Sequence, residues 1–304
     1  MEAALQSKLV RQIMARKAAE HLLETKSREL YYLNQELKEQ RDRLDMINTE
    51  VKDSIEYSKR IQQSLLPING IEASCVEDHF VLYLPKDIVS GDFYWQYEDK
   101  VNKKLVVATA DCTGHGVPGA FMSIIGKQAL DLAVIEHSIY NPSEILHAIN
   151  AHLSNFLQKE HNTHIQDGMD ISVYCINYSD DKHTILSYAG AMNSIYVVRN
   201  SNLVELKANR TSIGYLKAEI NPFKTQYVNI SSGDMIYSYS DGYADQFGGP
   251  IGKKLKSTQF KKILQENSKQ SMKNQRNTLE TLITKWKGEL EQVDDICVLG
   301  IRIK

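Results

Sequence analysis

The stretch KLVVATADCTGHGVPGAFMS, residues 104–123, carries the strongest structural signals in this 304-residue chain. After its first lysine, a run of β-branched and small apolar residues is typical of a buried β-strand. Asp111 follows this run at once and opens a glycine-containing turn. A carboxylate at the end of a buried strand costs free energy unless something compensates its charge. We therefore expect Asp111 to lie at a functional site.

Three other places in the chain repeat this combination of an acidic residue with a strand end. Asp92 follows a short apolar run in PKDIVSGDFYW, and Asp241 ends the strand-like run DMIYSYS. Asp294 and Asp295 precede the final run, ICVLGIRI. A single Asp–Gly pair is most simply a turn, but four such places together predict carboxylates that converge on one point.

Converging carboxylates repel one another unless cations lie between them. Oxygen ligands without an accompanying His or Cys set favour Mg²⁺ or Mn²⁺ over zinc. Two such ions that share a carboxylate can lower the pKa of a bridging water and hold a phosphoryl oxygen in line. Phosphate monoesters need rate factors of up to ~10²¹. The acidic residues thus predict two divalent ions and hydrolysis of a phosphate ester.

The region from about Phe80 onward alternates between strand-like and helix-like stretches. Turn residues separate several of the strand-like runs, which favours antiparallel hairpins. The runs are FVLYLP, KLVVATAD, ISVYCINY, TILSYAG, SIYVVR, QYVNI, DMIYSYS and ICVLGIRI. The helix-like stretches are Ala120–His137, Pro142–Lys159, Thr258–Glu266 and Asn274–Leu290. This order predicts an α+β fold in layers.

Residues 1–66 differ in composition, because they contain no glycine or proline and many helix formers. Apolar residues recur in a heptad pattern at Leu30, Leu33, Leu37, Leu44, Ile47, Val51, Ile61 and Leu65. This pattern predicts a long helix that pairs as a homodimeric coiled coil. The alternative is one amphipathic helix that folds back on its own domain.

Three polar residues, Gln40, Ser54 and Ser58, interrupt this heptad pattern. The weak stretch around the two serines is where we expect a signal to change the packing of the helix. Pro67 ends the helix. We therefore divide the chain into a helical dimerisation and signalling segment (1–66), a linker (67–79) and a second domain (80–304).

Composition excludes several classes of protein. Lys and Arg total 36 against 38 Asp and Glu, a net charge of −2, so a nucleic-acid partner is not expected. There is neither a run of about 18 apolar residues for a membrane span nor the apolar core of a secretory signal. The four cysteines form no CxxC pair. They favour a reduced, cytoplasmic protein.

Six motifs occur in an order and spacing that resemble a known family. They are SGDFYW (90–95), DCTGHGVPGAFMS (111–123), DGMDI (167–171), YAGA (188–191), SDGYADQFGG (240–249) and QVDDI (292–296). Together they resemble the stage II sporulation E-type branch of the PPM (protein phosphatase 2C-like) serine/threonine phosphatases, over roughly residues 80–304. The resemblance implies a β-sandwich flanked by helices, with a pair of metal ions in a cleft at one end.

The resemblance also implies a set of metal-binding residues: Asp92, Asp111, the carbonyl of Cys112, Asp241, Asp294 and Asp295. Asp111 would bridge both ions, and it and Asp92 are the catalytic candidates. Cys112 stands where the family usually has glycine, but only a backbone carbonyl is required. Asp294 aligns with the family's ligand, and Asp295 is the alternative that either hydrogen-bonds beside it or replaces it.

Several other residues have two interpretations. His115 is either a general acid or a residue that hydrogen-bonds within its turn, which we favour. Asp167 and Asp170 either bind a third metal or cap a turn, and again we favour the simpler role. The lysines at 253–256 form a solvated face or attract an acidic partner. The histidines at 161 and 164 are more typical of a surface loop than of a metal site.

The phosphate clamp is a departure from the family pattern. Eukaryotic members use an early arginine, but no arginine occurs here between Arg60 and Arg199. Lys86 could supply a point charge, or the metals alone would bind the phosphate.

The resemblance implies an Mn²⁺- or Mg²⁺-dependent phosphatase acting on phosphoserine or phosphothreonine through a metal-bridged hydroxide. Its substrate would be a small phosphorylated regulator, of the anti-sigma-factor-antagonist type, in a partner-switching circuit. The alternative is a catalytically silent dimeric signalling scaffold that retains the fold, although such a scaffold has no use for buried charges. A phosphodiesterase or nuclease is disfavoured because the chain lacks a basic stripe.

Overall fold

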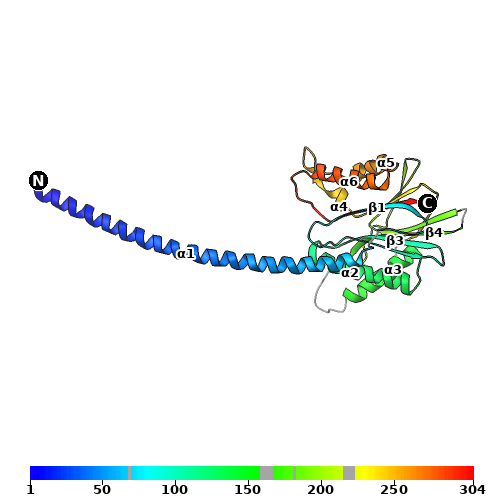
Figure 1. Cartoon of the computed structure of the whole chain (residues 1–304), viewed down its shortest axis with the longest axis horizontal. Helices are drawn as coiled ribbons and strands as arrows, with labels where there is room; N and C mark the ends of the chain where they lie inside the picture. The colour runs from blue at the N-terminus through cyan, green and yellow to red at the C-terminus, as the bar shows by residue number, and fades with distance from the viewer. Residues whose placement is uncertain (68–69, 158–166, 181–182, 215–222) are drawn as a thin grey trace. The chain divides into compact units, whose positions relative to one another are not determined.

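A computed structural model describes the chain except residues 68–69, 158–166, 181–182 and 215–222. The chain divides into two compact units, Met1–Ser54 and Ile55–Lys304 (Figure 1). The long helix α1 (Glu2–Leu65) makes up the first unit and enters the second. The predicted N-terminal helix is therefore confirmed.

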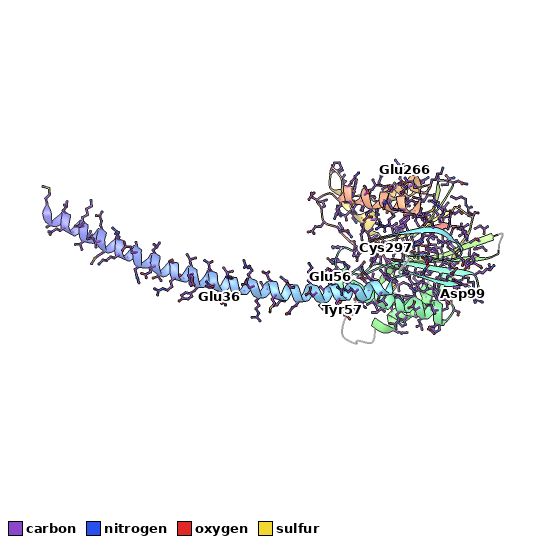
Figure 2. All side chains as sticks on the ribbon, viewed as in Figure 1. Glu36, Glu56, Tyr57, Asp99, Glu266 and Cys297 are labelled. Atoms are coloured by element: carbon purple, nitrogen blue, oxygen red, sulfur yellow. The ribbon has the colours of Figure 1, made fainter. Side chains whose placement is uncertain are left out.

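The N-terminal unit exposes the apolar side chains of its heptad pattern. Their exposed fractions lie between 42% and 59% for Leu30, Leu33, Leu37, Leu44, Ile47 and Val51. Figure 2 shows side chains projecting from the helix along its length. A helix that has not paired exposes such a regular apolar stripe to solvent. The pairing of this helix stays a prediction.

The second unit contains two five-stranded antiparallel sheets. The first has the order β1 (Val76–Leu84), β12 (Ile296–Ile303), β9 (Met235–Tyr239), β6 (Ile195–Arg199) and β7 (Asn202–Leu206). The second has the order β2 (Phe93–Asp99), β3 (Lys104–Cys112), β4 (Met169–Asp180), β5 (His183–Ala191) and β8 (Gln226–Ile230).

Strand β3 shows why the sheets stack as a sandwich. Its apolar run is buried on both faces, because successive side chains of a strand point to opposite sides. Leu105 and Val107 pack between the two sheets with Leu299 and Ile301 of β12. Their neighbours in β3, such as Val106, belong instead to a cluster formed with helices. A continuous apolar run therefore marks a strand in the interior of the fold.

Helices cover both outer faces of the sandwich. On the second sheet lie α2 (Gly116–Leu130), a π-helical turn (Asp131–Glu136) and α3 (Pro142–Leu157). On the first sheet lie α4 (Gly242–Asp245), α5 (Ser257–Asn267) and α6 (Met272–Lys287). The predicted α+β fold, a β-sandwich flanked by helices, is confirmed (Figure 1).

Sequence reasoning missed five elements: strands β2 and β7, the one-turn helix α4, and the hairpin strands β10 (Phe247–Gly248) and β11 (Lys253–Lys254). Strand β2 reads FYWQYED, in which polar residues interrupt the aromatic ones, and β7 is half-exposed. Short strands of mixed polarity give little periodic signal.

Candidate metal centre

Strand register brings three acidic residues side by side on the second sheet. Phe93 of β2 lies opposite Ala110 of β3, so Asp92, one residue earlier, lies next to Asp111. Asp111 in turn lies opposite Asp170 of β4. Residues directly opposite each other in an antiparallel pair have neighbouring side chains. Three carboxylates therefore meet at one end of this sheet.

The first sheet contributes the other carboxylates. Strands β9 and β12 are antiparallel neighbours, so Asp241, just after β9, lies beside the residues that precede β12. The approach is close, because a Cβ atom at Gly242 would lie 2.0 Å from the carbonyl oxygen of Asp295. Only glycine fits there. The turn after Asp241 and the segment that carries Asp294 are thus in contact.

Hydroxyl groups join the strands directly behind the carboxylates. The Oγ1 atom of Thr109 and the Oγ atom of Ser238 are 2.7 Å apart and connect the two sheets. The amide of Cys297 donates to Ser240 Oγ at 2.9 Å. A hydrogen bond from Ser240 also opposes part of the rise that burial causes in the pKa of Asp92. This network fixes the backbone from which the acidic side chains project.

Asp92 is the most deeply buried member of the group. Its side chain is 2% exposed, and among the described residues its Oδ2 atom has no hydrogen-bond partner. Burial, followed by the negative charge of Asp111, raises the pKa of Asp92 well above its usual range. A buried carboxylate oxygen without a partner is costly. A bound cation would remove this cost.

The other carboxylates also oppose one another's ionisation. Burial, with the charges of Asp241 and Asp294, raises the pKa of Asp111 to about 8. Loss of solvent, with the charges of Asp245 and Asp294, raises the pKa of Asp241 to about 6, although this side chain keeps contact with water. Burial also raises the pKa of Asp170. Oxygen donors that repel each other fit Mg²⁺ or Mn²⁺.

These side chains do not form a finished coordination shell. Among the described residues, no group of three or more His, Cys, Asp or Glu side chains is placed so that it could hold a metal ion. The carboxylate oxygens are donors that fit a hard divalent cation, and the unpartnered oxygen of Asp92 also favours a bound cation. Binding would require the carboxylates to turn toward a common point.

The neighbouring residues Asp294 and Asp295 have different environments. Asp295 is 3% exposed, and its two oxygens accept hydrogen bonds from the amides of Lys86 (2.7 Å) and Gly91 (2.8 Å). Asp294 is half-exposed, and its Oδ1 atom accepts a hydrogen bond from the amide of Asp295 at 2.9 Å. Asp295 thus joins the last strand to the 86–91 loop, whereas Asp294 keeps an oxygen for another partner.

The turn after Asp111 packs tightly against the loop that carries Asp92. A Cβ atom at Gly91 would lie 2.6 Å from the carbonyl oxygen of Gly114 and 3.1 Å from that of Cys112. His115 Nδ1 lies 2.5 Å from Asp87 Oδ2, so this histidine bonds to the neighbouring loop rather than inside its own turn. The histidines at 161 and 164 lie outside the described residues.

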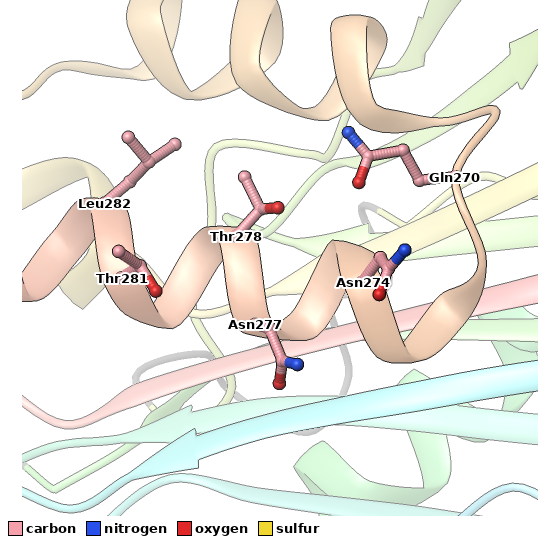
Figure 3. A pocket seen from close by; sticks show the side chains of 6 residues that line it. All are labelled: Gln270, Asn274, Asn277, Thr278, Thr281 and Leu282. Atoms are coloured by element: carbon pink, nitrogen blue, oxygen red, sulfur yellow. The ribbon is translucent and has the colours of Figure 1, made fainter.

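A pocket elsewhere in the unit is a weaker candidate. It has a volume of about 310 Å³ and lies along α6 (Figure 3). Its lining side chains are Gln270, Asn274, Asn277, Thr278, Thr281 and Leu282, none of them titratable. Without an acid, a base or a nucleophile, this pocket offers no catalytic group.

Comparison with known proteins decides the family. The sequence profile described as Stage II sporulation protein E (SpoIIE) matches residues 102–304. The chain belongs to the SpoIIE family. No curated protein matches the chain at a significant level.

Solved structures agree with the SpoIIE assignment. The SiaA-PP2C domain of Pseudomonas aeruginosa is 29% identical, with a TM-score of 0.76 over 84% of this chain and 98% of that one. A fragment of SpoIIE from Bacillus subtilis is 20% identical, with a TM-score of 0.57 over 75% and 61% of the two chains. The RsbU and RsbW domains of Rv1364c from Mycobacterium tuberculosis are 18% identical, with a TM-score of 0.58 over 76% and 61%. The last two likenesses show the fold alone.

Magnesium appears in one related structure, RsbX, which is 17% identical with a TM-score of 0.54 over 77% of this chain and 98% of that one. SpoIIE-family members share the PPM serine/threonine phosphatase fold, whose enzymes depend on metal ions. No described helix of this SpoIIE-family chain has the length and apolar character needed to cross a membrane.

Two features of the SpoIIE-family site escaped the sequence analysis. Asp170, interpreted as a turn residue, lies opposite Asp111, and only the strand register could have revealed this. Lys254 forms an ion pair with Asp245, with Nζ and Oδ2 2.5 Å apart, and its charge lowers the pKa of Asp241. The signal for Lys254 was its position a few residues after the motif SDGYADQFGG.

Proposed function

We propose that the chain is a metal-dependent protein phosphatase that hydrolyses phosphoserine and phosphothreonine. The observation that carries this proposal is the strand register that sets Asp92, Asp111 and Asp170 side by side, with the buried Oδ2 atom of Asp92 unpartnered among the described residues. Membership of the SpoIIE family supports the same reaction class. The site is acidic, and burial raises the pKa of the neighbouring Cys112 thiol well above its usual range. A thiolate nucleophile is therefore disfavoured, which favours attack by water.

The ligands that we propose are Asp92, Asp111, the carbonyl of Cys112, Asp241 and Asp294, for two Mn²⁺ or Mg²⁺ ions. Asp111 would be shared, because it lies between the acids of both sheets. We assign Asp294 rather than Asp295, because two backbone amides already occupy the oxygens of Asp295. When bound, the ions would supply positive charge for the phosphoryl oxygens and acidify the attacking water, with no phosphoenzyme.

The protein's own groups would orient this chemistry. Asp92 is held in a buried position, where it would face the second ion or its water. Asp295 fixes the 86–91 loop that carries Asp92. The serine and threonine hydroxyls behind the carboxylates keep the two sheets in register. A rigid frame is what positions an attacking water in line.

We further propose that α1 forms a homodimer and relays a signal to the phosphatase domain, with the segments 1–66, 67–79 and 80–304 as the functional parts. Gln62 supports the relay. Its buried amide donates to Ser90 O (2.5 Å) and Ser123 Oγ (3.0 Å) and accepts from Ser90 N (3.1 Å). Ser90 stands two residues before Asp92.

The substrate that we propose is a small phosphorylated regulator of the anti-sigma-factor-antagonist type, in a partner-switching circuit. The relative from Mycobacterium tuberculosis combines RsbU and RsbW domains, which supports this choice. The four buried free thiols fit a reducing compartment, so we place the protein in the cytoplasm.

The test is hydrolysis of p-nitrophenyl phosphate by the full chain with Mn²⁺, with and without EDTA. We expect metal-dependent turnover that Asp111→Asn abolishes. The matched control is Asp78→Asn, since Asp78 is exposed near the other end of β1, opposite Arg302. Calorimetric Mn²⁺ binding is measured in parallel. A protein that binds no Mn²⁺ and turns over no substrate would be a scaffold with the phosphatase fold, and the proposal would fail.

A further inference from the structure

A short hairpin leaves the candidate metal centre directly after Asp241 and the single turn α4. Its strands β10 and β11 pair Phe247 with Lys254, so these two side chains share one face. Lys254 Nζ lies 5.9 Å from the centre of the Phe247 ring. The ring is 39% exposed, and Ile251 at the hairpin tip is 71% exposed. The hairpin thus presents apolar and cationic groups to solvent beside the acidic centre.

Gln246 fixes the start of this hairpin. It is fully buried, and its carbonyl accepts a hydrogen bond from Trp286 Nε1 at 3.0 Å. Its side chain accepts from the amide of Val293 (3.1 Å) and donates to the carbonyl of Glu291 (3.0 Å). The segment that leads to Asp294 is therefore joined to the hairpin. A surface held in this way is ready for binding without an ordering cost.

Two glycines hold the hairpin against the end of α6. A Cβ atom at Gly248 would lie 1.9 Å from the carbonyl oxygen of Trp286. The amide of Gly249, whose φ is +68°, donates to the same carbonyl at 2.8 Å. Neither position accepts a larger residue without movement of the backbone. The position of the hairpin beside the site is therefore built into the fold.

The charge of the hairpin is opposite to that of the centre. Lys253, Lys254 and Lys256 are all exposed. Lys254 is the cation whose charge reaches Asp241, and it is paired with Asp245. Lys256 has a φ of 74°, which glycine would adopt without strain and which a lysine adopts only at a conformational cost. Lys253 projects to the opposite face of the hairpin from Lys254, because neighbouring residues of a strand alternate. Lys254 therefore carries the positive charge on the face that the Phe247 ring shares, beside the acidic site.

We propose, on the basis of the proposed phosphatase function, that this hairpin docks the substrate segment next to the phosphorylated residue and selects acidic side chains there. We call Phe247, Ile251, Lys254 and Lys256 the hairpin surface. Acidic side chains that flank the phosphorylated residue would pair with these exposed lysines on the side where the substrate chain would lie. The exposed ring and Ile251 provide apolar contact for its neighbouring residues.

The experiment compares two fluorescent phosphoserine peptides that differ only in the flanking residues, Asp and Glu in one and Asn and Gln in the other. Their affinity for the full-length protein is measured by fluorescence anisotropy, and their kcat/KM by phosphate release with Mn²⁺. We expect the acidic peptide to bind about fivefold more tightly at low salt, as a few exposed ion pairs allow. High salt should reduce this preference.

Variants assign the preference to the hairpin. Lys254→Glu should reduce the acidic-to-neutral affinity ratio to about one, and Lys256→Gly should reduce it without adding backbone strain. Lys273→Glu is the matched control, because it makes the same charge change at the other end of α6 from Trp286, about 20 Å away along the helix. It should leave the ratio unchanged.

The outcomes separate this inference from the proposed function. A wild-type ratio of one, or a ratio that survives Lys254→Glu, would overturn the docking surface even if p-nitrophenyl phosphate is hydrolysed. Absence of metal-dependent turnover would overturn the phosphatase proposal, while the affinity ratio would still report on the hairpin.

Discussion

Helix α1 exposes apolar side chains to water, whereas the acidic edge of the sandwich buries a carboxylate. In the N-terminal unit, leucines such as Leu37 and Leu44 lie in water. At the sandwich edge, Asp92 lies out of water, with one oxygen unpartnered among the described residues. Either arrangement is unfavourable for a single chain by itself. The comparison shows why we propose a component from outside the polypeptide for each region, a second helix in one case and cations in the other.

The largest expected effect concerns the two neighbouring acids of the edge, Asp294 and Asp295, to which we assign different roles. Asp294→Asn should lower kcat by about 1,000-fold, since a metal ligand supports several kcal/mol of transition-state stabilisation, with little change in the free energy of unfolding. Asp295→Asn should instead lower the free energy of unfolding by about 2 kcal/mol, because two backbone amides lose a charged acceptor. Phosphatase assays and urea denaturation without metal measure both. If Asp295→Asn lowered kcat and Asp294→Asn lowered the free energy of unfolding, the metal ligand would be Asp295 instead.

The next largest effect concerns the helix. Replacing Leu37 and Leu44 by lysine should raise the dimer dissociation constant about 100-fold or more, because each buried leucine contributes about 1.5–3 kcal/mol. Sedimentation equilibrium measures it. Asp42→Lys, at the heptad position farthest from the apolar pattern, is the control and should leave the dimer intact. A wild-type chain that stays monomeric at high concentration would contradict the proposed coiled coil.

A third test addresses the end of α1 within the second unit. Gln62→Ala should lower the free energy of unfolding by about 2 kcal/mol, because the buried amide and carbonyl of Ser90 lose their partner. Its exposed neighbour supplies the control, Gln63→Ala, for which a change below about 0.5 kcal/mol is expected. Urea denaturation measures both. Equal effects would show that the hydrogen bonds of Gln62 contribute nothing specific.

A fourth test concerns the dependence of the melting temperature on pH. The folded-state pKa of Asp111 is raised to about 8 and that of Asp241 to about 6, from 3.8. Their contribution to stability is complete below pH 3.8 and is lost as the pH rises through 6 and 8. Metal-free protein should therefore melt at lower temperature at pH 8 than at pH 5.

Added Mn²⁺ should reverse this trend by binding the ionised carboxylates. Asp111→Asn should remove the part of the pH dependence between 6 and 8, and Asp78→Asn should leave it in place. A metal-free melting temperature that rises from pH 5 to pH 8 would contradict the mutual repulsion on which the metal centre rests.

Periodicity predicted the long helix and most strands, because those elements repeat one pattern over many residues. The ranges of the predicted helices needed only small adjustment; the helix expected from Ala120 begins at Gly116. Strand β2 and the β10–β11 hairpin were missed, because their polarity is mixed. A metal-binding role for Asp170 was not favoured, because its own motif does not reveal that Asp111 of β3 lies opposite it.

By itself, the sequence determined where the strands end and that acidic residues stand at four of those ends. It also determined the apolar stripe of α1, since helix period and residue type are local properties. Only the tertiary structure decided that Asp295 is occupied by backbone amides and that a lysine hairpin lies beside Asp241. Those facts depend on which distant segments meet, and contacts between residues some 200 positions apart are fixed by packing and strand register, not by local pattern.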